Sequence, residues 1–430
     1  MPKLFTNINE DLCVRAVFEC FAGKWSRGDI LSFIEEWTGI DRAVFKKTSM
    51  TGNAELKVEA GETIGMALYD VVADICAGKD IGDIIEPVRI EERVDGNSGK
   101  IRKIATLDIW HQLIGHTVKL SLDKLFHARL LPTQHASIPG KGQTRLKEQA
   151  KHYLHRNGLG IRYIQKTDVY HAYASTQYSI VTGLIRREIP RAKKTIRLLE
   201  FLGMLAPGGS LIIGGYLDAW LFNYAMSYAL RELSGYGHER RGKVTFYVQK
   251  AETYMDDFGL MASTKSGLKK AVKKLLRWMN ENLNLQLKLS TDIIALYPSE
   301  EENRRRKEKR ASKRACPGLD MGGYVIHRTY TTIRSRNFIR ARRQWLRGWK
   351  DLQEKGTLPL YRAQKIIAYN GFVKQTNSMN IRNKYHTTKL LEAAKRVVSY
   401  YGRKEGRERE DKVNAVYERY CKRKARCCYN

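Results

Sequence analysis

Three aspartates stand where metal-dependent chemistry would need them. Asp256 and Asp257 lie between two apolar runs, ETYM and FGLMAS, and Asp168 ends another strand-like run, in KTDVYHAYAS. A tight turn between two strands would bring the Asp pair to the edge of a sheet, where a strand-ending aspartate could lie beside it. Enzymes that join nucleotides use two divalent ions about 3.5–4 Å apart, and Mg²⁺ prefers carboxylate oxygens on rigid backbone. The pattern predicts such a site, although each string alone is also typical of an ordinary acidic turn.

The composition points to a polyanionic partner. The chain has 430 residues, enough for more than one domain, and 43% of them are hydrophobic, as in a globular protein. Lysine and arginine number 77 against 45 acidic residues, which gives a formal net charge of +32. A single basic run is typical of a solvated helix face, but several runs with interleaved aromatic residues favour a channel that holds RNA. The runs are Arg186–Arg197, Asn303–Arg314, Arg334–Arg347 and Arg403–Arg426.

Several other classes of protein are disfavoured. The apolar stretches are too short to cross a bilayer, and the N-terminus MPKLFTNINEDLC lacks a signal pattern, so we expect no membrane partner and a cytoplasmic location. The seven cysteines include no C-x-x-C pair, which favours reduced thiols. The histidines are not spaced as zinc ligands.

Periodicity predicts an α+β fold. Two strands, VRIEERV and KIRKIATL, flank a turn at Asp95–Gly99, and a second hairpin is expected in MGGYVIHRTYTTIR. A third strand is expected over Arg162–Asp168, a polar turn around Ser49–Asn53 and mostly helix after Asn337. The expected helices cover Asp11–Phe21, Ile30–Trp37, Glu62–Ala77, Ile109–Phe126, Leu146–His155, Thr176–Arg187, Thr195–Leu205, Asp218–Leu233 and Ser266–Asn282.

In this order, the basic hairpin, the strand-ending Asp168, the glycine loop Pro207–Gly215 and the hairpin Asp pair resemble the fingers and palm of prokaryotic reverse transcriptases. The resemblance covers Val88–Val325. It implies a right-hand polymerase, in which an antiparallel palm sheet with helices is followed by a helical thumb. The implied domains are an N-terminal helical extension over 1–60, fingers and palm over 61–330 with a basic loop at 299–317, and a thumb with a basic tail over 331–430.

The resemblance assigns the catalytic centre. DVYHAYAS is similar to the first palm motif, and YMDD is identical to a common form of the second acidic motif. It implies that Asp168, Asp256 and Asp257 are catalytic and, with the Val169 carbonyl, hold two Mg²⁺ ions, with Mn²⁺ as an alternative.

The resemblance also assigns residues to the incoming nucleotide. Lys100 and Arg102 would grip its triphosphate, because cationic side chains and above all the arginine fork bind phosphate oxygens. Ala172 and Tyr173 follow the first aspartate, and the Tyr173 ring would exclude a ribose 2′-hydroxyl. The alternative interpretation of Tyr173 is an aromatic residue that only packs in the interior.

The glycine-loop motif of the family is matched only in part. In GGYLDAWLFN, Gly214 and Asn223 match and are implied to bind nucleotide, but Asp218-Ala219 replaces Ser-Gln and Phe222 replaces Ala. The departure puts standard template handling and nucleotide choice in doubt.

The template–primer contacts form a separate group. Tyr254 and Met255 of YMDD would approach the template–primer. MGGYVIH resembles the primer-grip hairpin, with Gly322, Gly323 and Tyr324 at its turn.

The resemblance implies an RNA-directed DNA polymerase of a bacterial or phage element that copies a dedicated noncoding RNA in anti-phage defence. Its partners would be RNA, the DNA product and dNTPs, with an accessory protein or a homo-oligomer left open. A diversity-generating retroelement or retron enzyme, a template-independent DNA-synthesising enzyme and a non-catalytic RNA-binding scaffold are the alternatives.

Overall fold

The computed structural model describes residues 3–51, 54–94, 101–155, 160–288, 292–296, 318–328 and 330–403. By its internal contacts the chain divides into two compact units. Described residues within Met1–Leu130 and His171–Met226 form the first unit, and those within Leu131–Tyr170 and Ser227–Gly406 form the second.

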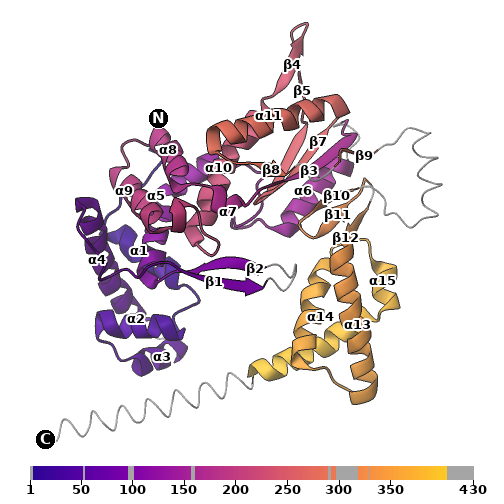
Figure 1. Cartoon of the computed structure of the whole chain (residues 1–430). Helices are drawn as coiled ribbons and strands as arrows, with labels where there is room; N and C mark the ends of the chain where they lie inside the picture. The colour runs from indigo at the N-terminus through magenta and orange to yellow at the C-terminus, as the bar shows by residue number, and fades with distance from the viewer. Residues whose placement is uncertain are drawn as a thin grey trace, which may run out of the picture. The chain divides into compact units, whose positions relative to one another are not determined.

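The first unit is mostly helical and carries one hairpin (Figure 1). In the hairpin, β1 pairs antiparallel with β2, so that Arg93 lies opposite Arg102. Helix α10 (Tyr216–Ser234) begins in this unit, which includes its residues to Met226. The other elements are α1 (Glu10–Phe21), α2 (Gly28–Thr38), α3 (Arg42–Thr51), α4 (Glu55–Ala77), β1 (Arg89–Val94), β2 (Ile101–Thr106), α5 (Ile109–Arg129), α7 (Ala172–Ser175), α8 (Tyr178–Glu188), α9 (Lys193–Leu205) and the 3₁₀ turn η2 (Pro207–Gly209).

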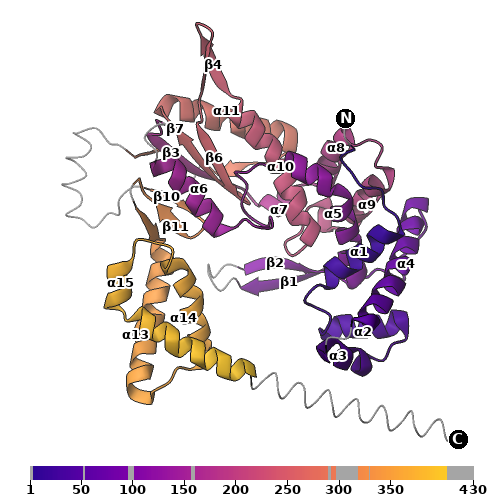
Figure 2. The same ribbon diagram turned by 180° about the vertical axis from the view of Figure 1, so that it is seen from behind.

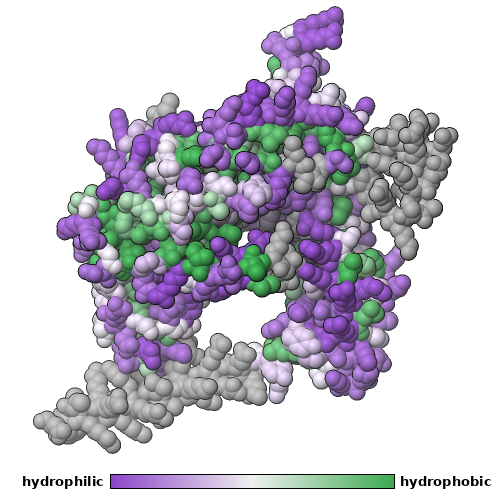
Figure 3. Space-filling view, in the orientation of Figure 1, coloured by the Kyte–Doolittle hydropathy of each residue, from purple (hydrophilic) through white to green (hydrophobic). Residues whose placement is uncertain are grey.

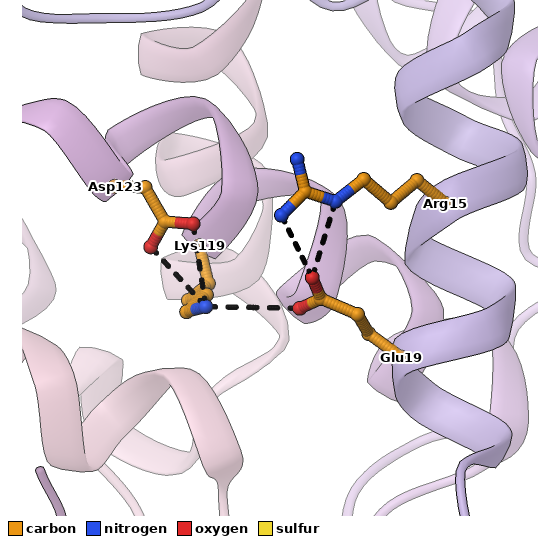
Figure 4. Close-up of polar contacts among 4 residues, drawn as sticks. All are labelled: Arg15, Glu19, Lys119 and Asp123. Carbon is orange, nitrogen blue, oxygen red and sulfur yellow. Dashed lines mark hydrogen bonds and ion pairs between the residues drawn. The ribbon is translucent and has the colours of Figure 1, made fainter. Parts of the chain in front are cut away.

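Helices α1 and α5 pack together through apolar stripes, and a small ion network joins them at the edge (Figure 4). The Lys119 ammonium on α5 lies 3.2 Å from Asp123 one turn along and 3.7 Å from Glu19 on α1. Arg15 holds the other oxygen of Glu19 at 3.1 Å. Because Lys119 is largely covered, this network fixes the pairing of the two helices more firmly than an exposed ion pair would.

The second unit contains the larger sheets and a group of C-terminal helices. Residues 387–403 are also helical. Its elements are α6 (Gln143–His155), β3 (Tyr163–Val169), β4 (Gly237–Arg240), β5 (Lys243–Phe246), β6 (Lys250–Tyr254), β7 (Asp257–Ala262), α11 (Lys265–Leu283), β8 (Leu287–Lys288), β9 (Ile294–Ala295), β10 (Leu319–Met321), β11 (Tyr324–Ile326), β12 (Thr331–Ile333), α13 (Ser335–Lys355), α14 (Leu360–Val373) and α15 (Met379–Lys384).

The central sheet of this unit has the strand order β6-β7-β3-β8, with β9 also paired to β3. Side chains alternate between the two faces of a strand, so Ile164, Lys166 and Asp168 share one face and Gln165 and Thr167 the other. Ile164 belongs to an apolar cluster with α6 and the β10–β11 hairpin. Helix α11 packs on β3 and β7 (Figures 1 and 2). Its lysines border a groove together with Gln165. The face that carries Asp168 is therefore the one opposite α11.

The C-terminal helices have a core of their own. Trp345 on α13, Ile366 on α14 and Leu390 are buried together in one apolar cluster. This cluster is joined to the β10–β12 sheet through Phe372, which packs on Tyr324 with ring centroids 5.5 Å apart. The exposed side of α13 carries the arginines of the basic run.

The α+β class predicted from the sequence is confirmed at the level of mixed helices and small antiparallel sheets. Both predicted hairpins are present, and the predicted helices are found with ends shifted by several residues. One prediction is wrong where it is described: Ser49–Thr51, expected in a polar turn that reaches Asn53, belong to α3. The helix expected from Asp218 is α10, which begins two residues earlier, so Asp218 lies in its first turn. Lys100, the predicted turn Asp95–Gly99, the whole basic loop 299–317 and the basic tail after residue 403 lie outside the described residues. No helix among the described residues is long and apolar enough to cross a bilayer.

Candidate functional site

The second unit brings the three predicted aspartates to one end of its central sheet. Asp257 is paired with Tyr254 on one side and lies opposite Asp168 of β3 on the other. Met255 and Asp256 thus form a two-residue turn, and Met255 has a left-handed φ of 53°. The Val169 N–H donates to the Asp256 carbonyl over 3.1 Å, which fastens the turn to the end of β3. The backbone therefore sets the three carboxylates side by side.

Electrostatic strain is concentrated on Asp256. Its pKa is raised from 3.8 to about 7, because burial removes water from the carboxylate, because a hydrogen bond with Asp168 favours a proton, and because Asp168 and Asp257 repel its charge. The Oδ1 atom of Asp168 is buried without a hydrogen-bond donor. Two carboxylates in such contact cannot both be ionised cheaply, so the pair retains a proton near neutral pH unless a cation enters.

Two lysines, neither of them singled out by the sequence, supply the counter-charges. The Lys166 ammonium lies 2.8 Å from Asp257, and Lys288 lies 3.2 Å from Asp168 and 5.2 Å above the Tyr170 ring. Burial raises the pKa of Asp257, while Lys166 and, at longer range, Arg334 lower it. Lys166 stands two residues before Asp168, on the same face of β3, which is the one sequence signal that could have found it.

Within the ranges that the structure describes, no group of three or more His, Cys, Asp or Glu side chains is gathered closely enough to hold a metal ion. Lys166 pairs with Asp257, and Lys288 pairs with one oxygen of Asp168. The donor chemistry nevertheless fits a hard divalent cation. The site offers carboxylate oxygens on rigid backbone, one of them buried without a donor, and a retained proton that a cation would displace.

Behind the aspartate turn lies a buried pair that the sequence did not reveal. His135 Nε2 and a Glu252 carboxylate oxygen are in hydrogen-bond contact, and both side chains are fully buried. The backbone N–H of His135 donates to the Thr253 carbonyl over 3.1 Å, and the backbone N–H of Thr253 donates to the Thr133 carbonyl over 2.9 Å. Burial raises the pKa of Glu252 to about 9 and lowers that of His135 to about 4, so the pair is a neutral hydrogen bond at pH 7. It anchors the strand that ends in the turn.

The residues predicted to meet template and primer fall into two groups within this unit. Tyr254 packs against the cluster built from α6 and the β10–β11 hairpin, and burial raises its pKa. Gly322 and Gly323 form the hairpin turn with φ of 57° and 87°. A Cβ on Gly322 would meet Leu146 at 2.9 Å, and one on Gly323 would meet Phe372 at 2.7 Å, so glycine is required at both positions.

Tyr324, predicted with that turn, is the first residue of β11 rather than a turn residue, and it is buried. Its ring packs on Phe372, as described above, and the Lys147 ammonium lies 5.6 Å above it.

The predicted nucleotide-binding residues apart from Val169 belong to the first unit where they are described. Ala172 is buried at the start of α7, and the half-buried Tyr173 ring stacks on Phe222 at 5.4 Å with planes 17° apart. Arg102 is exposed on β2. Its neighbour Lys100 is not among the described residues.

The glycine loop is held against the hairpin. Gly214 has φ of 114°, and a Cβ there would meet the Ala105 carbonyl at 2.8 Å; the Ala105 N–H also donates to the Ile213 carbonyl over 2.8 Å. Asn223 is buried inside α10, where its side-chain amide donates to the Ala219 carbonyl over 3.0 Å. Gly214 is therefore in close contact with β2, whereas the Asn223 side chain bonds to the backbone of its own helix.

Asp218, which departs from the family pattern, has a structural use. Its Oδ1 accepts from the Ile212 N–H at 2.9 Å and from the Tyr178 hydroxyl at 3.1 Å, and the side chain is buried. Burial raises its pKa to about 6, against the effect of these hydrogen bonds. The aspartate therefore ties the glycine loop to α8 and α10.

A scan against models of known protein families finds no match for the chain, and a search of curated proteins finds no similar sequence.

Proposed function

We propose that the chain is an RNA-directed DNA polymerase that transfers deoxynucleotides to a primer 3′-hydroxyl on an RNA template. The observation that carries the proposal is the register of Asp168 opposite Asp257, with Asp256 in the adjoining turn and its pKa raised to about 7. Three carboxylates that repel one another on a rigid strand end and its adjoining turn hold a proton near neutral pH, and a divalent cation that displaces this proton would relieve the repulsion.

In this proposal Asp168, Asp256 and Asp257, with the Val169 carbonyl, would hold two Mg²⁺ ions. Bound there, the ions would supply activation of the attacking hydroxyl and charge neutralisation at the leaving pyrophosphate. The protein's own contribution is positional. The β6–β7 turn and the end of β3 fix the carboxylates, and the His135–Glu252 pair holds β6 from behind. Lys166 and Lys288 balance the charge until cations enter.

The finer architecture belongs to the same proposal. The central sheet of the second unit would be the palm, the β1–β2 hairpin with its neighbouring helices the fingers, residues 1–60 an extension, and residues from 331 the thumb. RNA, dNTPs and the DNA product are the proposed partners, the cytoplasm the proposed compartment and anti-phage defence the proposed setting. The net charge of +32 supports a nucleic-acid partner.

The test is incorporation of labelled dNTPs on a defined RNA template with a DNA primer and Mg²⁺. Substituting asparagine for both Asp256 and Asp257 should abolish synthesis, while RNA binding and folding persist. Synthesis that survives the double substitution would refute the assignment of the site. Product that fails to match the template would favour template-independent transfer instead.

A further inference from the structure

Helix α11 carries an unusual concentration of positive charge on its outer side. Its apolar residues Leu268, Ala271, Val272 and Leu275 are buried, while the solvent side up to Arg277 carries six cations, followed in the last turn by the exposed Asn280, Glu281 and Asn282. These cations are Lys265, Lys269, Lys270, Lys273, Lys274 and Arg277. Lys274 pairs with Glu232. Within the described ranges, no acid lies within ion-pair distance of Lys265, Lys269 or Lys273. Such a face has a positive potential that attracts a polyanion.

The first stripe of cations borders a groove. Lys265, Lys269 and Lys273 follow one another at intervals of four residues, so they lie in one row with a spacing of about 6 Å along the helix. Together with Gln165 and Asp292, among others, they line a cavity of about 580 Å³. A row of ammonium groups beside this groove suits successive phosphates of one strand, and among the described lining residues Asp292 is the single acidic group.

Lys270 and Lys274 form a second stripe, which contacts aromatic rings next to the β4–β5 hairpin. The Lys274 ammonium lies 4.4 Å above the Tyr236 ring, and that of Lys270 lies 5.4 Å above the Tyr247 ring. The two rings meet edge to face at 4.9 Å. Cations whose side chains are already ordered lose less entropy when they bind a phosphate.

The β4–β5 hairpin extends this charged face outward beyond α11 (Figure 1). All its strand residues except Gly237 are exposed, and Arg240, Arg241 and Lys243 surround its turn. Figure 3 shows hydrophilic residues toward the tip of the hairpin, and the exposed Val244 and Phe246 belong to its second strand. Helix and hairpin therefore form one surface, the α11–hairpin face, defined by the cations of α11 together with Arg240, Arg241 and Lys243.

We propose that the α11–hairpin face binds the phosphate backbone of a base-paired RNA segment. Because α11 covers the sheet face opposite Asp168 and Asp257, this RNA would lie away from the aspartates and would be held as a structural part of the complex. The proposal rests on the proposed function in naming RNA as the polyanion. It adds a second RNA-binding surface within the same unit.

The test compares three full-length variants. The first is Lys269→Gln/Lys273→Gln/Arg277→Gln. The second keeps the charge, as Lys269→Arg/Lys273→Arg/Arg277→Lys. The third removes the same charge from exposed positions of the first unit, as Lys3→Gln/Arg42→Gln/Lys124→Gln. The probes are a 20-base-pair blunt RNA duplex, whose binding is titrated over a range of salt concentrations, and a short RNA template with a DNA primer for synthesis.

The glutamine variant on α11 should bind the duplex roughly tenfold or more weakly near physiological salt, and its slope of log Kd against log salt should be shallower by about 2–3. The other two variants should bind as the unchanged protein does, and all should extend the short primer normally. Duplex binding equal to that of the control variant would overturn the proposal. Phosphatidylserine vesicles are a third probe. If the glutamine variant on α11 loses binding only to these anionic vesicles, the proposal is overturned in favour of a membrane surface. If neither the unchanged protein nor any variant synthesises DNA, while the glutamine variant on α11 still loses duplex binding, the polymerase proposal fails and the proposed RNA-binding surface stands.

Discussion

Replacing Asp256 by asparagine should stabilise the second unit while destroying its proposed activity. A carboxyl whose pKa rises from 3.8 to about 7 on folding is disfavoured as a carboxylate by up to roughly 4 kcal/mol, at about 1.4 kcal/mol for each pKa unit. The folded state binds more protons than the unfolded state between these values, so stability falls as pH rises through this window. The neutral amide removes that penalty. Its advantage should be small near pH 4 and complete above pH 7.

Mg²⁺ should act in the opposite direction. It binds the folded carboxylates of the unchanged protein and should stabilise it by about 2.7 kcal/mol at a hundredfold excess over Kd, but it should do little for the variant. Hydrogen exchange of the β3 and β7 peptides measures the opening of this sheet itself, which a melt of a two-unit chain would blur. Asp83→Asn, at an exposed position of the first unit, is the matched control. An Asp256→Asn variant that exchanges faster at pH 8, or that Mg²⁺ stabilises as well as the unchanged protein, would refute the reasoning.

Three further predictions follow from other contacts. Glu252→Gln should fold normally at pH 7, because the amide still donates to His135. It should remove the share of the stability loss that Glu252 contributes as pH rises from about 4.5 to about 9. Hydrogen exchange of the β6 peptide against pH measures this, and identical profiles for the two proteins would contradict a neutral pair. Asp218→Ala should destabilise the first unit by about 2–4 kcal/mol, because it leaves two buried donors without an acceptor, whereas Asp218→Asn should cost less than half as much. Equal denaturation midpoints for the two variants would contradict the role of Asp218 in holding the glycine loop. Charge reversal at Arg342 and Arg343 should weaken RNA binding and flatten its salt dependence, and unchanged titrations would remove α13 from the RNA-binding surface.

Strong local patterns were predictable from the sequence. The helix expected over Ile109–Phe126 is found as Ile109–Arg129, and the strands expected around Tyr254–Asp257 are β6 and β7. Apolar periodicity over many residues and a two-residue acidic turn both leave a clear signal, because they depend on neighbours in the chain. Helix ends are harder to predict, since a capping side chain competes with several others nearby.

Pairings across long stretches of chain were not predictable. His135 and Glu252 are separated by 117 residues, and neither position differs from an ordinary loop or strand residue in the sequence. The β4–β5 hairpin was missed because nearly all its strand residues are exposed and no apolar alternation marks it. Its turn residues Arg241 and Gly242 both have positive φ, and an X-Gly turn was the only signal available.

The most direct test of the central claim is to sequence the DNA made by the purified protein. The chain is isolated with its bound nucleic acid, given Mg²⁺ and labelled dNTPs, and compared with the Asp256→Asn/Asp257→Asn variant. The account predicts DNA complementary to a co-purified RNA from the unchanged protein and none from the variant. DNA that matches no RNA, or equal product from both proteins, would contradict it.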